Sequence, residues 1–449
     1  MTGRHGPHFW QAGVIAAVLL LSVLAGRQLF QDGIAFVVFS LQDPLWFPQP
    51  TPRRFFSVIW STGLVRLLGQ VDSDAIRLGG FLFGFMVFSQ VAVPAAVIVS
   101  ARIGSLAKHL VLAAFLSGAL LIANFAVTEL LFAYGLTAIF VTLTLDPSRD
   151  RKAVIRFVMA ILLIASYEIV AVSNLFLALS SATRARRETR PRWSKIALVL
   201  VLCAAPPFQV AWYAVNPQPG MGAAKDWLMY PIIGASVLLA GAMLVYFRAV
   251  VASVVLRRIG LSVVLLAPLT LLILPDSFGW RSELFLLGYP SRLYTMGMTC
   301  FLAMLPTLLD ERLTPLPSRL LSGIGEQPIR DLSAAMTAIF CGLSLLASVD
   351  AYVYRTRLDA ALSEYGGVVA LGDCEFCLHP DGAADLSFSW TWPVVGMAHT
   401  MLRLDRPPMV VLNDPASKSE TYPFSRAEID AFLRREQGRR VPAGRPSAN

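Results

Sequence analysis

Residues 31–78 read QDGIAFVVFSLQDPLWFPQPTPRRFFSVIWSTGLVRLLGQVDSDAIRL and follow the first apolar segment of the chain. The stretch is too polar to cross a bilayer, but it is too rich in aromatic and aliphatic residues to be a free loop. It carries Asp43 and the pair Arg53 and Arg54 among tryptophans and phenylalanines. We therefore expect amphipathic helices that form a shelf on the outer face of a membrane, with an acid and two cations above an apolar floor.

The composition of the whole chain indicates a protein with many membrane spans. Of its 449 residues, 56% are hydrophobic and only 15% are charged, whereas a soluble globular domain carries roughly 25% charged residues. Apolar runs close to the length that crosses a bilayer recur along the sequence. The net charge of +9 does not indicate nucleic-acid binding, because the basic residues lie in short loops between apolar runs, as the positive-inside rule describes.

Two of the apolar runs, residues 110–145 and 153–182, are too long for one span each. As a single helix, residues 153–182 would be about 45 Å long, which exceeds the thickness of a bilayer. We therefore predict two helical hairpins, which turn near residues 124–129 and 166–168. As hairpins, both runs keep the basic loops that flank them on the same side of the membrane. One long span is the alternative for residues 153–182.

With this topology, every strongly basic loop lies in the cytoplasm. The predicted fold is mainly α: a polytopic bundle of about 11 spans over residues 1–350, with its N-terminus in the cytoplasm. Residues 351–449 are more polar and are predicted to form a small extracytoplasmic α+β domain with a disordered end. Alternating and β-branched residues indicate its short strands, and a capping box marks its helix. The expected strands are 368–371, 386–392 and 409–412, and the expected helix is 425–435.

Carboxylates at the predicted outer face are the first candidate site residues. Glu129 and Glu168 fall at the turns of the two hairpins, the second of them next to Tyr167, and Asp43 lies on the shelf. Acids near membrane depth are costly and usually mark a functional site. The alternative for each is that it ends a helix in water.

Four arginines on the predicted outer face are not expected from the positive-inside rule: Arg53, Arg54, Arg281 and Arg292. A guanidinium group suits phosphate because it can donate two parallel hydrogen bonds. Contact with lipid headgroups is the alternative. Arginines to hold a phosphate, an apolar groove to hold a prenyl chain and a carboxylate to act as base are together what a lipid-phosphate donor requires.

Cysteine and histidine add little to this site. Cys374 and Cys377 are followed by His379, but the tail supplies no second cysteine pair. A disulfide is therefore the expected state outside the cytoplasm, with a metal site or free thiols as alternatives. The carboxylates match no metal motif, so we predict no metal site in the bundle. None of the five histidines falls at the predicted outer mouth of the bundle, which disfavours histidine-dependent acyl transfer.

The layout resembles the GT-C superfamily of integral-membrane glycosyltransferases over residues 9–350. The matching features are the first loop with Asp43, the Thr128–Glu129 turn, the turn at residues 166–168 and the small domain at the C-terminus. Members of this superfamily have many spans and a long first outer loop that carries an acid. Many of them place that acid directly after the first span. Here Asp32 occupies that position, so Asp32 is the alternative to Asp43 as the base.

The resemblance implies an inverting glycosyltransferase in a plasma membrane, such as the bacterial inner membrane, that acts on its periplasmic or exoplasmic face. Its partners would be a polyprenyl-phosphate-linked sugar, a glycan or lipid acceptor, and membrane lipids. No cofactor is certain, although the acids at the hairpin turns could help to bind a divalent cation. A flippase or transporter of lipid-linked glycan precursors is the main alternative, and a polymerase or ligase of surface polysaccharide is another.

The expected roles divide between three groups of residues. The first supplies the base, the second binds the donor phosphate, and the third orients the acceptor. In that order, these are Asp43 or Asp32; Arg53, Arg54, Arg281 and Arg292; and Glu129, Glu168 and Tyr167.

Overall fold

A computed structural model describes most of the helical part of the chain. The residues that it describes are 9–29, 32–42, 55–71, 76–124, 130–147, 152–167, 170–185, 193–215, 261–269, 284–309, 325–362, 364–370, 373–374, 392–402, 408–412 and 426–440.

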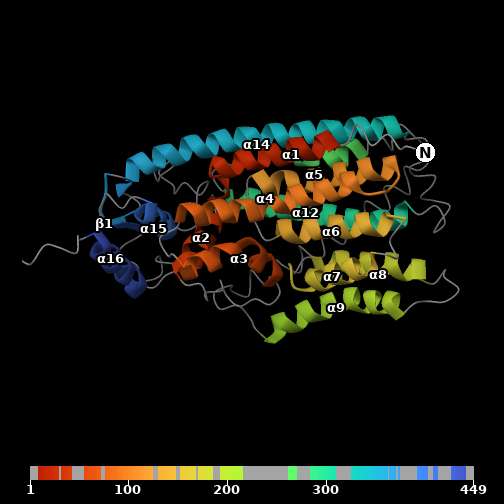
Figure 1. Cartoon of the computed structure of the whole chain (residues 1–449), viewed down its shortest axis with the longest axis horizontal. Helices are drawn as coiled ribbons and strands as arrows, with labels where there is room; N and C mark the ends of the chain where they lie inside the picture. Colours follow the sequence, from red (N-terminus) through yellow and green to blue (C-terminus); the bar gives the residue numbers. More distant parts are fainter. Residues whose placement is uncertain are drawn as a thin grey trace, which may run out of the picture.

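The described part is a long bundle of helices with a small α/β unit at one end (Figure 1). Within the bundle, α4 packs against α1, α3 and α6, and α5 packs against α12 and α14. Pairs among α7, α8 and α9 form one edge of the bundle. The helices are α1 Phe9–Leu24, α2 Asp32–Gln42, α3 Phe55–Val71, α4 Ile76–Ser100, α5 Ser105–Asn124, α6 Leu130–Leu145, α7 Ala153–Ile164, α8 Val170–Ala185, α9 Trp193–Val215, α12 Leu284–Leu308 and α14 Glu326–Leu362, with a 3₁₀ turn, η1, at Arg27–Leu29.

The two predicted hairpins are confirmed. The first apolar run divides between α5, which ends at Asn124, and α6, which begins at Leu130. The second divides between α7, which ends at Ile164, and α8, which begins at Val170. With 12 residues, α7 is about 18 Å long, so it is too short to cross a bilayer by itself.

Helix α14 runs along the whole bundle and joins it to the C-terminal unit (Figure 1). Its 37 residues correspond to about 55 Å. The helix continues without a break through Asp350, where the sequence analysis placed the end of the membrane domain. Ala351, Leu358 and Leu362 are buried at helical spacing beyond that point, so the apolar face that holds α14 on its neighbours extends to its last turn.

The C-terminal unit contains two parallel strands, β1 Gly367–Ala370 and β2 Met409–Leu412. These confirm two of the predicted strands, and α16 (Arg426–Arg440) confirms the predicted helix. Parallel strands need a crossover, and α15 (Trp392–Leu402) lies between them in the chain and packs on β2. A Cβ at Gly396 would lie 2.7 Å from the Val411 nitrogen, so glycine permits this close approach. Trp392, the last residue of the third predicted strand, begins α15, and residues 386–391 lie outside the described part.

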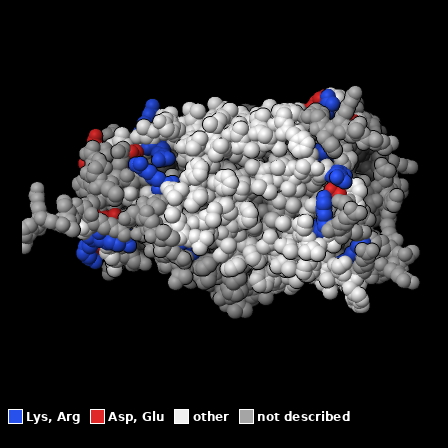
Figure 2. Space-filling model, in the orientation of Figure 1, with Lys and Arg blue, Asp and Glu red and all other residues white. Residues whose placement is uncertain are grey.

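Charged and apolar residues are separated along the long axis. Figure 2 shows lysine, arginine, aspartate and glutamate gathered toward the two ends, with a band of other residues between them. Two of the described helices, α4 and α14, are long and apolar enough to cross a membrane by length and composition. The count of about 11 spans stays a prediction. We call the end that carries α15, α16 and the strands the tail end of the bundle.

Helices α4 and α6 pack closely at Gly135. A Cβ there would lie 2.6 Å from the Gln90 carbonyl oxygen, and a backbone atom cannot move aside as a flexible side chain can. We expect Gly135→Ala to lower the free energy of unfolding by about 1–3 kcal/mol through overpacking. Thermal unfolding of the purified chain would measure this change. Gly342→Ala is the control, because nothing lies within 4 Å of a Cβ at that position; equal melting temperatures for the two variants would contradict the prediction.

Candidate functional site

Helix α3 lies along α4 instead of forming a flat shelf. The Trp60 indole nitrogen donates to the Met86 carbonyl oxygen at 3.2 Å and to Ser89 Oγ at 3.3 Å. Further along, a Cβ at Gly79 would lie 3.4 Å from Val65, so the two helices run antiparallel. Of the expected amphipathic shelf, the flat arrangement is therefore wrong for α3. The exposed face of α3 is apolar, as at Leu64 and Leu67, whereas its buried face carries polar residues such as Ser61, Thr62 and Arg66. The helix is thus amphipathic with its polar side toward the bundle, and its outward face suits apolar surroundings.

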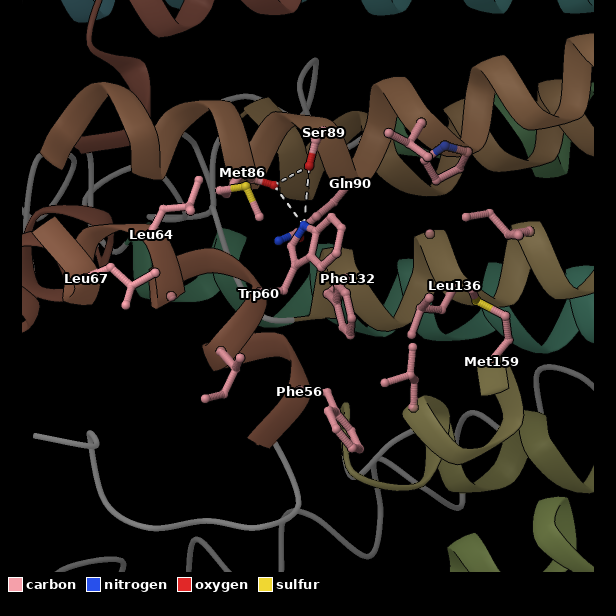
Figure 3. Close-up of a pocket in the computed structure, with 17 residues that line it drawn as sticks. Phe56, Trp60, Leu64, Leu67, Met86, Ser89, Gln90, Phe132, Leu136 and Met159 are labelled. Atoms are coloured by element: carbon pink, nitrogen blue, oxygen red, sulfur yellow. Dashed lines mark hydrogen bonds between the residues drawn. The ribbon is translucent and has the colours of Figure 1, made fainter. Parts of the chain in front are cut away.

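An apolar groove of about 590 Å³ opens between α3, α4, α6 and α7. We call it the α3 groove. Figure 3 shows Phe56 and Trp60 of α3 facing Phe132 of α6 across it. The Trp60 and Phe132 rings are 5.7 Å apart between centroids, and Met159 of α7 contributes to the lining. The volume falls in the range of small-molecule sites, about 300–1,000 Å³, and a lining composed mostly of carbon suits a hydrocarbon chain.

One boundary of the α3 groove is the place where α3 begins. The Phe56 amide nitrogen donates to the Ala165 carbonyl oxygen at 3.1 Å, and Ser57 Oγ donates to the Ser166 carbonyl oxygen at 2.8 Å. These bonds fasten the first turn of α3 to the turn that follows α7. Tyr167 lies in that turn and is buried, with 2% of its surface exposed. We call this junction the α3–α7 corner.

Most of the predicted site residues lie outside the described part of the chain. Tyr167 is described. Asp32 is the first residue of α2 and Arg292 belongs to α12, although their side chains are not described. The others outside the described residues are Asp43, Arg53, Arg54, Glu129, Glu168 and Arg281. The corner does bring together the described neighbours of two of them, because Phe55 follows Arg54 and Tyr167 precedes Glu168.

The C-terminal unit contains a buried cysteine. Cys374 is fully buried and disulfide-bonded. Its predicted partner, Cys377, lies outside the described residues, whereas Cys203, Cys300 and Cys341 are free thiols.

A histidine lies at the tail end of the bundle. His399 belongs to α15, which packs against α2 and α4, and its Nδ1 lies 2.9 Å from Asp359 Oδ1. This helix of the predicted C-terminal domain therefore packs on the bundle. Across the residues that the structure describes, histidine, cysteine and carboxylate side chains form no group of three that could hold a metal ion.

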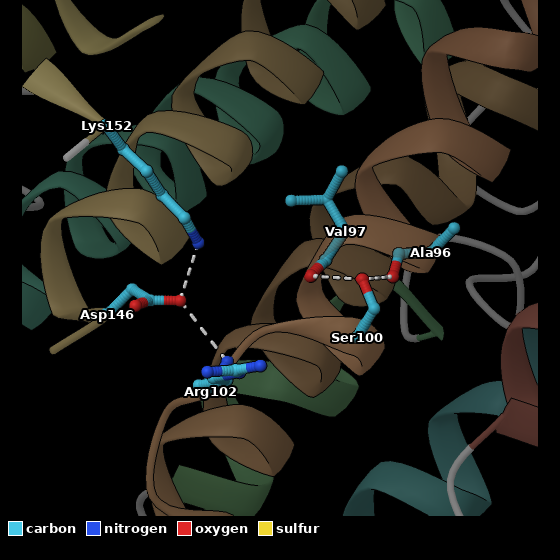
Figure 4. A network of polar contacts seen from close by, with 6 residues as sticks. All are labelled: Ala96, Val97, Ser100, Arg102, Asp146 and Lys152. Carbon is cyan, nitrogen blue, oxygen red and sulfur yellow. Dashed lines mark hydrogen bonds and ion pairs between the residues drawn. The ribbon is translucent and has the colours of Figure 1, made fainter. Parts of the chain in front are cut away.

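At the opposite end of the bundle, two basic loops meet on one acid (Figure 4). Asp146 is fully buried; it accepts a hydrogen bond from Lys152 Nζ at 2.8 Å and one from the Arg102 amide nitrogen at 3.3 Å. The loop after α4 and the loop before α7 are therefore at the same end. This agrees with the prediction that both basic loops lie on one side of the membrane.

The sequence analysis did not predict the buried polar cluster around Arg27. Arg27, in η1, is 2% exposed. Its guanidinium donates to Ser22 Oγ and to the Ser344 carbonyl oxygen, each at 3.2 Å, and to the Ala123 carbonyl oxygen. A lone arginine at the end of an apolar run is typical of the charges that flank a membrane span. The only sequence signal was Gly26 directly before it, which has φ +79° and turns the chain out of α1.

Comparisons of the chain with protein-family models, with curated proteins and with solved structures find no match.

Proposed function

We propose that this protein is a membrane glycosyltransferase that takes its sugar from a polyprenyl-phosphate carrier. The observation that carries the proposal is the α3 groove, an apolar cavity of about 590 Å³ bounded by the α3–α7 corner. A prenyl chain would lie in the groove against Phe56, Trp60 and Phe132. Its phosphate and sugar would then lie beyond the apolar lining.

Exposed apolar side chains on the described helices support a membrane location. Leu20, Phe85, Leu200 and Leu346 are between 47% and 65% exposed and lie on four different helices. Contiguous exposed apolar surface is rare on soluble monomers, and contact with lipid chains removes its cost. Charges gathered at the two ends fit a bilayer between them (Figure 2). We place the tail end on the periplasmic or exoplasmic side of a bacterial inner membrane, because the opposite end carries the basic loops.

Three of the predicted site residues are next in sequence to described residues at the groove or its corner. Consecutive Cα atoms are about 3.8 Å apart, so the backbones of Arg54 and Glu168 are each one residue from the α3–α7 corner. Glu129 directly precedes Leu130, the first residue of α6, and Phe132 of α6 lines the groove. A phosphate-binding arginine and two acids are thus tied by short connections to the groove or its corner.

The proposed reaction has one displacement step. Asp43, or Asp32 in its place, accepts the proton of an acceptor hydroxyl as that oxygen bonds to the anomeric carbon of the donor sugar. The bond from the anomeric carbon to the phosphate oxygen breaks, and polyprenyl phosphate leaves with the electron pair. The configuration at the anomeric carbon is inverted. Arg53, Arg54, Arg281 and Arg292 hold the departing phosphate. Glu129, Glu168 and Tyr167 orient the acceptor, which is a glycan or a lipid.

Blocking the groove tests the proposal. Gly63 lines the groove, and nothing lies within 4 Å of a Cβ placed on it, so Gly63→Leu adds a side chain to free space. We expect this variant to weaken binding of a long-chain polyprenyl phosphate about tenfold, because the new side chain takes the place of chain contacts. Geranyl phosphate, whose chain is short, should bind the variant and the unchanged protein alike.

Binding is measured with photoreactive analogues of both phosphates on the full chain in lipid nanodiscs. Gly342→Leu on α14 is the matched control, because it also adds leucine to open space but lies outside the groove lining. Equal labelling of the two variants by the long-chain probe would remove the groove from donor binding. Transfer of sugar from a panel of polyprenyl-phosphate hexoses to membrane acceptors is measured in parallel; chain binding without transfer of any sugar would favour a flippase.

A further inference from the structure

A second cavity, of about 200 Å³, lies at the tail end of the bundle. Residues from α1, η1, α2, α4, α14 and α15 line it. We call it the tail pocket; it shares no lining residue with the α3 groove. Its polar lining consists of Gln28, Arg77 and Arg355, while Ala398 of α15 closes part of its wall.

The two arginines of the tail pocket have no acidic partner in the described part of the chain. Arg77 is exposed and Arg355 is half-buried, and neither makes an ion pair or hydrogen bond with a residue that the structure describes. Two like charges that line one cavity repel each other. An anion between them would remove this repulsion and could accept hydrogen bonds from both guanidinium groups.

Gln28 also lines the cavity and carries an unused acceptor. Its side chain is 2% exposed, and its Nε2 donates to the Gly80 carbonyl oxygen at 3.0 Å. Its Oε1 is buried without a hydrogen-bond partner. An unsatisfied buried acceptor costs about 1–3 kcal/mol, which a hydroxyl or N–H donor on a ligand would recover. The pocket therefore suits a ligand with two features: a negative charge and a hydrogen-bond donor.

Two glycines leave room for the side chains of Gln28 and Arg355. A Cβ at Gly84 would lie 2.6 Å from Gln28 Cδ, so the glycine lets the Gln28 side chain lie flat on α4. Gly26 has φ +79°, and a Cβ on it would collide with Arg355 Nη1. The close packing of Arg355 on the turn before Gln28 therefore depends on Gly26.

The rest of the lining indicates where such a ligand comes from. Most small-molecule sites have volumes of about 300–1,000 Å³, and the tail pocket is smaller. Its volume suits the headgroup of a lipid. Leu24 and Phe81 line it and are also 62% and 38% exposed, so an apolar surface continues outward from the polar end. A phosphate ester with a free hydroxyl matches the polar groups, and acyl chains match this surface. We propose that the tail pocket binds an anionic phospholipid through the phosphate and hydroxyl of its headgroup.

Native mass spectrometry of the full chain in detergent tests the proposal with three lipids and one soluble ester. Phosphatidylglycerol has both the charge and the hydroxyl, phosphatidylmethanol has only the charge, and phosphatidylcholine has no net charge. We expect phosphatidylglycerol to bind tightest. The double variant Arg77→Gln/Arg355→Gln should lose about tenfold in its affinity through the loss of charged hydrogen bonds. Glycerol 3-phosphate, added without lipid, should bind far more weakly.

The role of Gln28 Oε1 as a hydrogen-bond acceptor is tested by a change in lipid preference. The unchanged protein should favour phosphatidylglycerol over phosphatidylmethanol, and Gln28→Met should abolish that preference while retaining affinity for both lipids. Arg330→Gln is the control for charge, because Arg330 is an exposed arginine on the same helix as Arg355. Melting temperatures show whether each variant is folded, and Arg77→Gln alone, for which a smaller loss of affinity is expected, replaces the double variant if that one does not fold.

Two results would overturn the proposal. If the double variant and Arg330→Gln bind phosphatidylglycerol equally, the tail pocket does not hold the lipid. If glycerol 3-phosphate binds as tightly as phosphatidylglycerol, the ligand is a soluble phosphate ester instead. Neither result depends on sugar transfer, so the proposed enzymatic function stands or falls separately.

Discussion

Replacing Asp43 with asparagine is expected to lower the rate of glycosyl transfer about 10²–10⁴-fold, the usual contribution of a general base. Asparagine has nearly the shape of aspartate but cannot take a proton from the acceptor hydroxyl. The loss should therefore appear in kcat, with binding of the polyprenyl-phosphate donor little changed. Product formation by the full chain in nanodiscs, measured by mass spectrometry under saturating donor, checks this expectation.

Asp32→Asn is the matched variant for this experiment. Asp32 begins α2, and Asp43 directly follows its last residue, Gln42. Eleven helical residues span about 16 Å, so one acceptor hydroxyl cannot be within reach of both carboxylates. Only one of the two substitutions should abolish transfer. If Asp32→Asn is the inactive variant, the base lies at the start of α2, as in the commonest layout of the GT-C superfamily.

The same pair of variants can also reject the proposed chemistry. If both retain full transfer at normal protein level, neither acid is the base. The role of base would then have to pass to Glu129 or Glu168, which the proposal uses only to orient the acceptor.

The parts of the fold that follow from local sequence were predictable. Runs of 30 or more apolar residues exceed the length of one span, so their length and the basic loops beside them favoured breaks at residues 124–129 and 166–168. The strands β1 and β2 are short β-branched runs between polar residues, which is a local signal.

The parts that depend on packing between distant segments were not predictable. Nothing in the sequence of α3 indicates that Trp60 donates to the Met86 carbonyl, because the face of α3 that packs on α4 is decided by the neighbouring helices. Likewise, α15 follows a stretch that alternates like a strand, and its place against α2 and α4 appears only when the tail folds back on the bundle.

The candidate site was predictable in its chemistry more than in its position. Residues 55–60 were expected to supply an apolar floor, and Phe56 and Trp60 do line a groove. The tail pocket was not foreseen, since Gln28, Arg77 and Arg355 are far apart in the chain and none belongs to a motif. A long-range convergence of single polar residues has no local signature, so only the assembled bundle reveals it.

Arg27→Ala is expected to lower the free energy of unfolding by about 3 kcal/mol. Each charged hydrogen bond contributes about 1.5–3 kcal/mol, although the cost of burying the guanidinium offsets part of their sum. The residue contacts four segments: its donors reach Ser22, Ala123 and Ser344, and its guanidinium carbon lies 4.9 Å from the centre of the Phe88 ring. Alanine would remove all of these contacts and leave a cavity.

Thermal unfolding of the purified chain measures the effect, with Arg330→Ala as the control on an exposed surface. Arg27→Lys keeps the charge but lacks the planar fork that reaches several acceptors, so its melting temperature should fall between those of the unchanged protein and Arg27→Ala. A melting temperature for Arg27→Ala equal to that of Arg330→Ala would mean that the buried cluster does not hold α1, α4, α5 and α14 together. Because η1 connects Arg27 directly to Gln28, loss of this cluster should also loosen the tail pocket, and lipid binding there should weaken in Arg27→Ala but not in Arg330→Ala.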